Sequence, residues 1–143
     1  MISEDTRIKE CLKFARSMIG VKWRHRGRKP WAVDCLGLIV LSLESVGYSV
    51  CDKSNYSREP WNDGLRKALH GHFGDPVSDM KPGDIFLMQW PNSGGPCHVG
   101  FIADYIHGGL SVIHSYSMQS VIEHRLDEKW KSLIVEVYRP WLS

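Results

Sequence analysis

A strongly apolar segment at residues 36–46 limits most severely how this chain can fold. Its side chains are apolar at most positions and would cover nearly every side of a helix, and Gly47 follows directly after it. A helix that is apolar on nearly all sides is stable only when other elements cover it. We therefore predict a buried helix that ends near Gly47 and runs through the core.

The residues at the head of this helix indicate thiol chemistry. Asp34 is a favourable N-cap, which would place Cys35 at the first helical position. Unpaired backbone N–H groups and the helix dipole favour a thiolate at that position. The sequence therefore predicts a lowered pKa for Cys35 and a role as nucleophile.

The order of the remaining elements predicts an α+β domain with N-terminal helices packed on an antiparallel sheet. Apolar spacing predicts an amphipathic helix at residues 8–19, with Ser3 as N-cap and Gly20 as terminator, and a shorter helix at 61–73. Residues 21–33 read as a loop. Strand-like segments follow a turn at 81–84 and lie at residues 85–90, 99–105, 110–115, 120–124 and 133–138.

Composition indicates a single globular domain over residues 1–143, since 43% of the residues are hydrophobic. The net charge of +2 does not indicate nucleic-acid binding, and the basic cluster at residues 22–29 reads as a solvated loop in preference to a site for an anionic polymer. Cysteines 11, 35, 51 and 97 form no CxxC pair or metal-ligand pattern, so no metal or cofactor is predicted.

No signal peptide or membrane span is predicted. The N-terminus lacks a basic head and an apolar stretch, and no segment approaches eighteen unbroken apolar residues. We expect a protein made in the cytoplasm with reduced thiols. If it acts outside the cell, another assembly must carry it there.

His98 is the preferred partner for the Cys35 thiol, because it opens a buried-looking strand that would fix its direction. His114 ends the next strand, where cross-strand pairing would let it orient His98. Cys97 should point to the opposite face from His98 and have a structural role. The other histidines, at positions 25, 70, 72, 107 and 124, are predicted to be solvated.

Together these motifs resemble the NlpC family of papain-like cysteine peptidases, which cut peptide stems of bacterial cell walls. The resemblance extends from Ile8 to Tyr138 and rests on Asp-Cys-x-Gly-Leu, Pro-Gly-Asp, His-Val-Gly and Ile-His in this order. It implies a papain-like fold in which Cys35 is the nucleophile, His98 the general base and His114 the polar third member. Trp23 replaces the usual family tyrosine twelve residues before the nucleophile. Trp23 and Asp34 are therefore expected at the oxyanion site and substrate groove.

The sequence Asp34-Cys35-Leu36-Gly37-Leu38 resembles members encoded by tailed phages and gene transfer agents. The family resemblance implies hydrolysis of peptidoglycan stems at the bond between D-glutamate and a diamino acid. The phage-type motif implies a virion-associated protein that acts in the periplasm or cell wall. Phage tail proteins are the implied partners. Two alternatives stay open: an assembly module of the tail tip that keeps the fold, and a papain-like amidase or acyltransferase.

Overall fold

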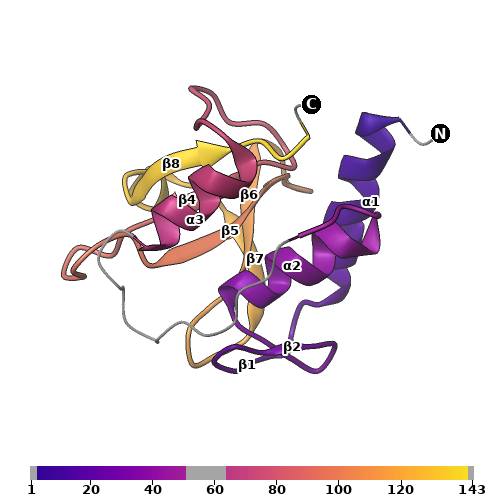
Figure 1. Ribbon diagram of the computed structural model, residues 1–143, viewed down its shortest axis with the longest axis horizontal. Helices are drawn as coiled ribbons and strands as arrows, with labels where there is room; N and C mark the ends of the chain where they lie inside the picture. Colours follow the sequence, from indigo (N-terminus) through magenta and orange to yellow (C-terminus); the bar gives the residue numbers. More distant parts are fainter. Residues whose placement is uncertain (1–2, 51–63, 142–143) are drawn as a thin grey trace.

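The computed structural model describes residues 3–50 and 64–141. Helices precede a five-stranded antiparallel sheet, as the sequence predicts, and the strand order is β7-β6-β5-β4-β8. Figure 1 shows α1 and α2 side by side, covering one face of this sheet. The elements of this framework are α1 (Glu4–Ser17), α2 (Cys35–Ser45), α3 (Gly64–Phe73), β4 (Ile85–Met88), β5 (His98–Asp104), β6 (Leu110–Ser115), β7 (Val121–Arg125) and β8 (Ile134–Tyr138).

The predicted N-caps of α1 and α2 are confirmed. Ser3 Oγ accepts a hydrogen bond from the Thr6 N–H at 3.2 Å, and Asp34 Oδ1 accepts one from the Gly37 N–H at 2.8 Å. These bonds satisfy backbone donors that have no partner within the helix. Both helices therefore begin where the sequence places them, and α2 begins at the cysteine.

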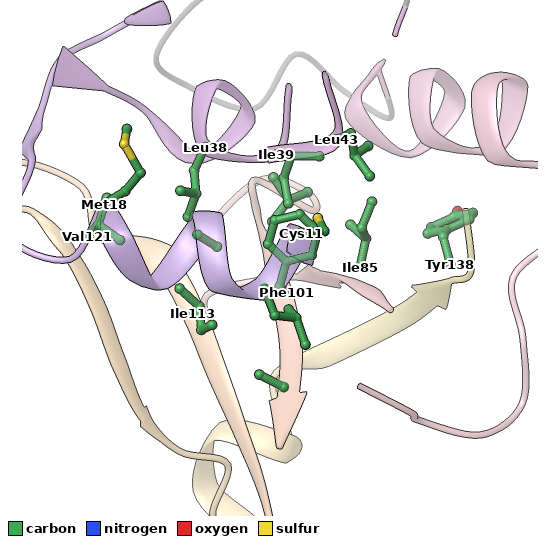
Figure 2. Packing of buried hydrophobic residues seen from close by; sticks show 14 of the residues in the cluster. Cys11, Met18, Leu38, Ile39, Leu43, Ile85, Phe101, Ile113, Val121 and Tyr138 are labelled. Atoms are coloured by element: carbon green, nitrogen blue, oxygen red, sulfur yellow. The ribbon is translucent and has the colours of Figure 1, made fainter. Parts of the chain in front are cut away.

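A hydrophobic core lies between the sheet and the two long helices. Figure 2 shows side chains of α2, including Leu38 and Ile39, directed toward Phe101 of β5 and Ile113 of β6. These side chains are almost completely buried. The burial of α2 on most sides explains its apolar sequence and holds its first turn firmly against the sheet.

A second, smaller core covers the opposite face of the sheet. It contains Phe86, Met88, Ile102 and Val112, which alternate along their strands with residues of the first core. Trp90 and Trp130 pack at its edge. Both faces of the central strands are thus covered, which explains why β4 reads as an unbroken apolar run.

Two parts of the structure differ from the sequence prediction. The segment predicted as a loop at 21–33 contains three short strands, β1 (Lys22–Trp23), β2 (Arg28–Lys29) and β3 (Ala32–Val33), arranged in the order β1-β3-β2. A short helix, α4 (Glu128–Lys131), lies before β8. Strands of two residues are too short to show the alternation that identifies strands in a sequence. Cys51 lies outside the described residues, and so does Trp61, where the sequence predicted the start of the third helix.

None of the helices within residues 3–50 and 64–141 has the length and apolar character needed to cross a bilayer.

Candidate active site

Asp34 organises the chain immediately before Cys35. Besides capping α2, its carboxylate accepts hydrogen bonds from Arg28 Nη1 at 2.9 Å and from the Arg26 N–H at 2.9 Å. Its exposed fraction is 3%, so the carboxylate is directed into the protein. Asp34 therefore ties the 22–33 segment to the helix start, and its expected place at the substrate groove stays a prediction.

The packing around Gly37 explains why the Asp-Cys-x-Gly-Leu motif has a glycine at this position. A Cβ atom at this position would collide with the backbone carbonyl of Gly27, which packs directly against the first turn of α2. Only glycine permits so close an approach of the backbone. The first turn of α2 is consequently fixed from two sides, by the Asp34 hydrogen bonds and by this backbone contact.

Cys35 is half-buried at the junction between α2 and β5. The backbone N–H groups of Leu36 and Val99 face its thiol and would stabilise negative charge on the sulfur. Because Val99 directly follows His98, this contact places the Cys35 thiol beside the His98–Val99 peptide. The structure thus brings the predicted nucleophile to the start of the strand that carries the predicted base.

The pKa of Cys35 does not follow the sequence prediction. Burial and the negative charge of Asp34 raise the pKa of the thiol to about 12, although the Val99 and Leu36 N–H groups oppose this shift. Cys97 also lies close enough to Cys35 for its charge to raise the pKa further. The helix N-terminus therefore does not make Cys35 a thiolate in the free protein. A base must take the proton when the sulfur reacts.

His98 and His114 are in direct contact, which confirms the predicted proximity of these two side chains. His98 Nε2 lies 2.7 Å from His114 Nδ1 across the β5–β6 pair. Both side chains are buried, with exposed fractions of 3% and 0%. Burial lowers the pKa of His98 to about 4 and, together with the charges of His98 and His124, lowers the pKa of His114 to about 2. Both imidazoles are therefore neutral at pH 7.

Gly100 makes the approach of the two histidines possible. A Cβ atom at this position would lie 2.6 Å from the Phe86 ring and 2.7 Å from His114 Cβ. Real Cβ contacts are essentially never this short, so a larger residue would displace His114 or the Phe86 ring. The glycine of the His-Val-Gly motif therefore has a steric role in the pairing of His98 with His114.

Aromatic side chains enclose the histidines. The Trp90 ring stacks on His98, with ring centroids 5.4 Å apart and an interplanar angle of 29°. Trp130 and Tyr116 both pack against His114. Such packing fixes ring orientations and limits access of water to the imidazoles.

His124 joins the site, although the sequence prediction treated it as solvated. His124 Nε2 lies 2.9 Å from His114 Nε2, and its ring packs against Trp130 with centroids 4.5 Å apart. It is half-buried on β7, two strands from His98. The alternating pattern of the strand predicted at 120–124 could have indicated this contact, because His124 lies on the same face of the sheet as His114 once β6 and β7 are paired.

Other predicted residues lie at the edge of this arrangement. Trp23 is half-buried on β1, pairs with Val33 of β3 and stacks against His25 at 6.4 Å. It therefore lies beside the strand that leads into Cys35, and its expected role at the oxyanion site stays a prediction. His70 and His107 are exposed as predicted, whereas His25 and His72 are half-buried.

No group of three His, Cys, Asp or Glu side chains in the described residues could hold a metal ion. The three histidines contact one another in a line and do not converge on a common point. Their nitrogens are engaged with each other, which is the arrangement of a hydrogen-bond relay.

A buried helix that begins at a cysteine and packs on an antiparallel sheet, with two histidines in contact on adjacent strands, defines a papain-like fold. The chain belongs to the NlpC/P60 family, whose family model matches residues 20–139. No curated protein matches this chain. This match confirms the family resemblance predicted from the sequence motifs.

Solved structures share the fold at low sequence identity. An NlpC/P60 family protein from Bacillus cereus has a TM-score of 0.68 and 17% identity, over 99% of this chain and 44% of that protein. The NlpC/P60 domain of the peptidoglycan hydrolase SagA has a TM-score of 0.56 and 20% identity, over 96% of this chain and 98% of that domain.

An N-acetylmuramoyl-L-alanine amidase from Bacteroides uniformis has a TM-score of 0.60 and 12% identity, over 93% of this chain and 98% of that protein. This chain spans less than half the length of several other similar structures, including the one from Bacillus cereus. These likenesses establish the fold that the site is built on.

Proposed function

We propose that this protein is a cysteine peptidase that hydrolyses peptide stems of bacterial peptidoglycan. Membership of the NlpC/P60 family supports a cell-wall substrate. The observations that carry the proposal are the buried His98–His114 pair at 2.7 Å and the Cys35 thiol at a helix start, which faces the backbone N–H of Val99, the residue after His98. Buried groups whose pKa values are shifted as far as those of His98 and His114 are frequent at functional sites.

In the proposed reaction, His98 acts as general base. It contacts His114 through Nε2, so Nδ1 is the nitrogen that accepts the thiol proton as the Cys35 sulfur attacks the peptide carbonyl. The Cys35 backbone N–H, at the first helical position, stabilises the oxyanion. Collapse of the intermediate breaks the C–N bond, and the His98 proton goes to the departing amine. Water then hydrolyses the thioester, with His98 as base again.

The proposed scissile bond joins D-glutamate to the diamino acid of the stem. Its support is the resemblance of the chain's motifs to the NlpC family of cell-wall peptidases. The similarity to an amidase makes the bond between N-acetylmuramic acid and L-alanine the alternative. Both bonds are amides, so the chemistry of Cys35 and His98 serves either.

Mass spectrometry of purified muropeptides tests the proposal. Incubation with the protein should release fragments whose masses identify cleavage within the stem, whereas amidase activity would release the intact stem. Cys35→Ala should abolish both products, and Cys11→Ala, which changes a core cysteine remote from the histidines, serves as the matched control. Unchanged muropeptides with folded wild-type protein would refute the proposal, and efficient cleavage of casein would refute its cell-wall specificity.

We further propose that a phage tail delivers the protein to the periplasm or cell wall. The support is again the resemblance of the Asp34–Leu38 motif to tail-associated members. Proteomic analysis of purified particles from the source strain should find the protein, and its absence would contradict this part. If particles with Cys35→Ala infect walled cells normally, an assembly role for the retained fold replaces the enzymatic one.

A further inference from the structure

Three histidines and one backbone carbonyl form a continuous line across three adjacent strands. His98 Nε2 meets His114 Nδ1 at 2.7 Å, and His114 Nε2 meets His124 Nε2 at 2.9 Å. The line ends where His124 Nδ1 meets the carbonyl oxygen of Arg125 at 3.1 Å. Every nitrogen in the line except His98 Nδ1 therefore has a hydrogen-bond partner.

The chemistry of this line fixes where each proton lies. A carbonyl oxygen only accepts, so His124 Nδ1 carries a proton, and the Nε2 of neutral His124 is an acceptor. His114 Nε2 must then donate to it, which makes His114 Nδ1 an acceptor. His98 Nε2 donates in turn, and the unshared electron pair of His98 is left on Nδ1.

A proton on His124 Nε2 reverses this order. His114 Nε2 must then accept, His114 Nδ1 must carry the proton, and His98 Nε2 must accept from it. The only proton of neutral His98 then sits on Nδ1, where it blocks the base. The two states differ at His98 although the change occurs at His124.

We propose that His124 is a positioning residue that selects, through His114, which ring nitrogen of His98 carries the proton. This inference rests on the proposed role of His98 as general base. His124 itself lies two strands from His98 and does not touch the reacting atoms.

Among the described side chains around His124, His114 is the one whose ring nitrogen contacts Nε2 of His124, and the charged neighbours have other partners or are exposed. On β7, Glu123 bonds to Arg16 and Ser111, and Arg125 extends to the carbonyls of His107 and Gly108. From β6, His114 makes the contact described, and Tyr116 lies against His114. From α4, the uncharged Trp130 ring covers His124, and the charged residues Glu128, Lys129 and Lys131 are exposed.

Three substitutions at position 124 separate the proposal from a structural role. His124→Gln offers a carbonyl acceptor to His114 and cannot be protonated, so it should keep kcat within about threefold. His124→Phe preserves ring packing on Trp130 but removes both nitrogens, and kcat should fall about tenfold. His124→Lys supplies only donors and imposes the reversed order, so kcat should fall about a hundredfold. KM should change little in each, and exposed His107→Phe is the control.

Nitrogen-15 NMR of labelled histidines provides a readout that needs no substrate. In the wild type near pH 7.5, the His98 signal should be that of the Nε2–H tautomer, and His124→Lys should convert it to the Nδ1–H tautomer. His124→Gln should retain the wild-type tautomer.

The proposal fails if His98 keeps one tautomer in all three variants that fold, or if His124→Phe and His124→Lys retain wild-type kcat. Circular dichroism and thermal unfolding identify a variant that does not fold. The tautomer of wild-type His98 near pH 7.5 then decides alone, and a signal of the Nδ1–H tautomer there would overturn the proposal. Because the tautomers are read without turnover, this test stands even if the muropeptide assay contradicts the proposed peptidase.

Discussion

The carboxylate of Asp34 lies 2.9 Å from Nη1 of Arg28, one residue before the cysteine that begins α2. This buried ion pair connects the short-strand segment to the site and also acts on its chemistry, because the charge of Asp34 raises the pKa of the Cys35 thiol. The same carboxylate therefore stabilises the fold and makes the nucleophile harder to ionise.

Asp34→Asn separates these two effects. The amide oxygen keeps the N-cap acceptor but loses the charge, so the pKa of Cys35 should fall and alkylation by iodoacetamide at pH 8 should become faster. The free energy of unfolding should fall by about 3 kcal/mol, because the ion pair with Arg28 loses its negative charge and the Arg26 N–H meets an amide NH2 group in place of Oδ2. Urea unfolding and alkylation rates test both. Asp5→Asn, an exposed change in α1, is the control, and slower alkylation of Asp34→Asn would contradict the assignment.

The pH dependence of Cys35 alkylation tests the resting state of the site. With a raised thiol pKa, the thiolate fraction and the alkylation rate should rise about tenfold per pH unit between pH 6 and 9. Peptide mapping should find Cys35 modified before Cys11, whose pKa is also about 12 but whose side chain is completely buried. A rate that stays constant below pH 7 would instead indicate a preformed thiolate–imidazolium pair.

Substitutions of His114 test its orienting role. His114→Asn keeps an acceptor near the position of Nδ1 and should retain measurable turnover of a stem peptide. His114→Ala leaves the His98 Nε2–H without a partner and should reduce kcat by about a hundredfold. His98→Gln should abolish turnover, because an amide does not accept and return a proton. Full activity of folded His114→Ala would show that another group orients His98.

The buried neutral histidines should make the protein less stable in acid. An unfolded histidine titrates near 6.5, whereas the pKa of His98 in the folded protein is about 4 and that of His114 about 2. Between pH 6.5 and 4, the unfolded chain therefore binds protons that the folded protein does not. The free energy of unfolding should fall by about 1.4 kcal/mol per pH unit for each of the two.

Urea titrations at several pH values between 7.5 and 4.5 measure this slope. His114→Asn removes one titrating group and should make the slope shallower than in the wild type. His107→Asn changes an exposed histidine at the tip of the β5–β6 hairpin and should leave the slope unchanged. Equal slopes in all three proteins would mean that His114 is not held neutral by burial.

The sequence predicted most elements of this fold because their patterns are long. The apolar run of α2, the cap at Asp34 and the order of strands from Ile85 to Tyr138 each have several residues in support. The contact of His98 with His114 followed from hairpin pairing alone. The family model and the structure agree with the papain-like fold expected from these motifs.

The features that were not predicted from the sequence depend on contacts between segments that lie far apart in the chain. Within residues 22–33, β1 and β2 pair with β3, and Lys22 of β1 forms a bridge with Ser120 of the β6–β7 turn, a contact that no local sequence pattern indicates. The pKa of Cys35 was predicted with the wrong sign, because the helix N-terminus was visible in the sequence and the burial by β5 was not. The contact of His124 with His114 could be predicted only with the register between β6 and β7.

Gly100 offers the sharpest test of how the fold positions the histidines. In Gly100→Ala, the new methyl group would lie within about 2.7 Å of the Phe86 ring and His114 Cβ. Because both neighbours are buried, relief requires a backbone shift, and the free energy of unfolding should fall by about 1–3 kcal/mol. Displacement of His114 should lengthen its bond to His98 and reduce kcat by at least tenfold, with KM less affected.

Gly71→Ala is the matched control, since a Cβ atom there meets no other atom within 4 Å and the residue lies in α3. Alanine is favoured over glycine in a helix, so this variant should be as stable as the wild type or up to about 1 kcal/mol more stable, with unchanged activity. Thermal unfolding and stem-peptide kinetics on both variants decide the matter. Wild-type kcat in Gly100→Ala would show that β5 and β6 adjust around the methyl group, and that Gly100 does not control the approach of His98 and His114.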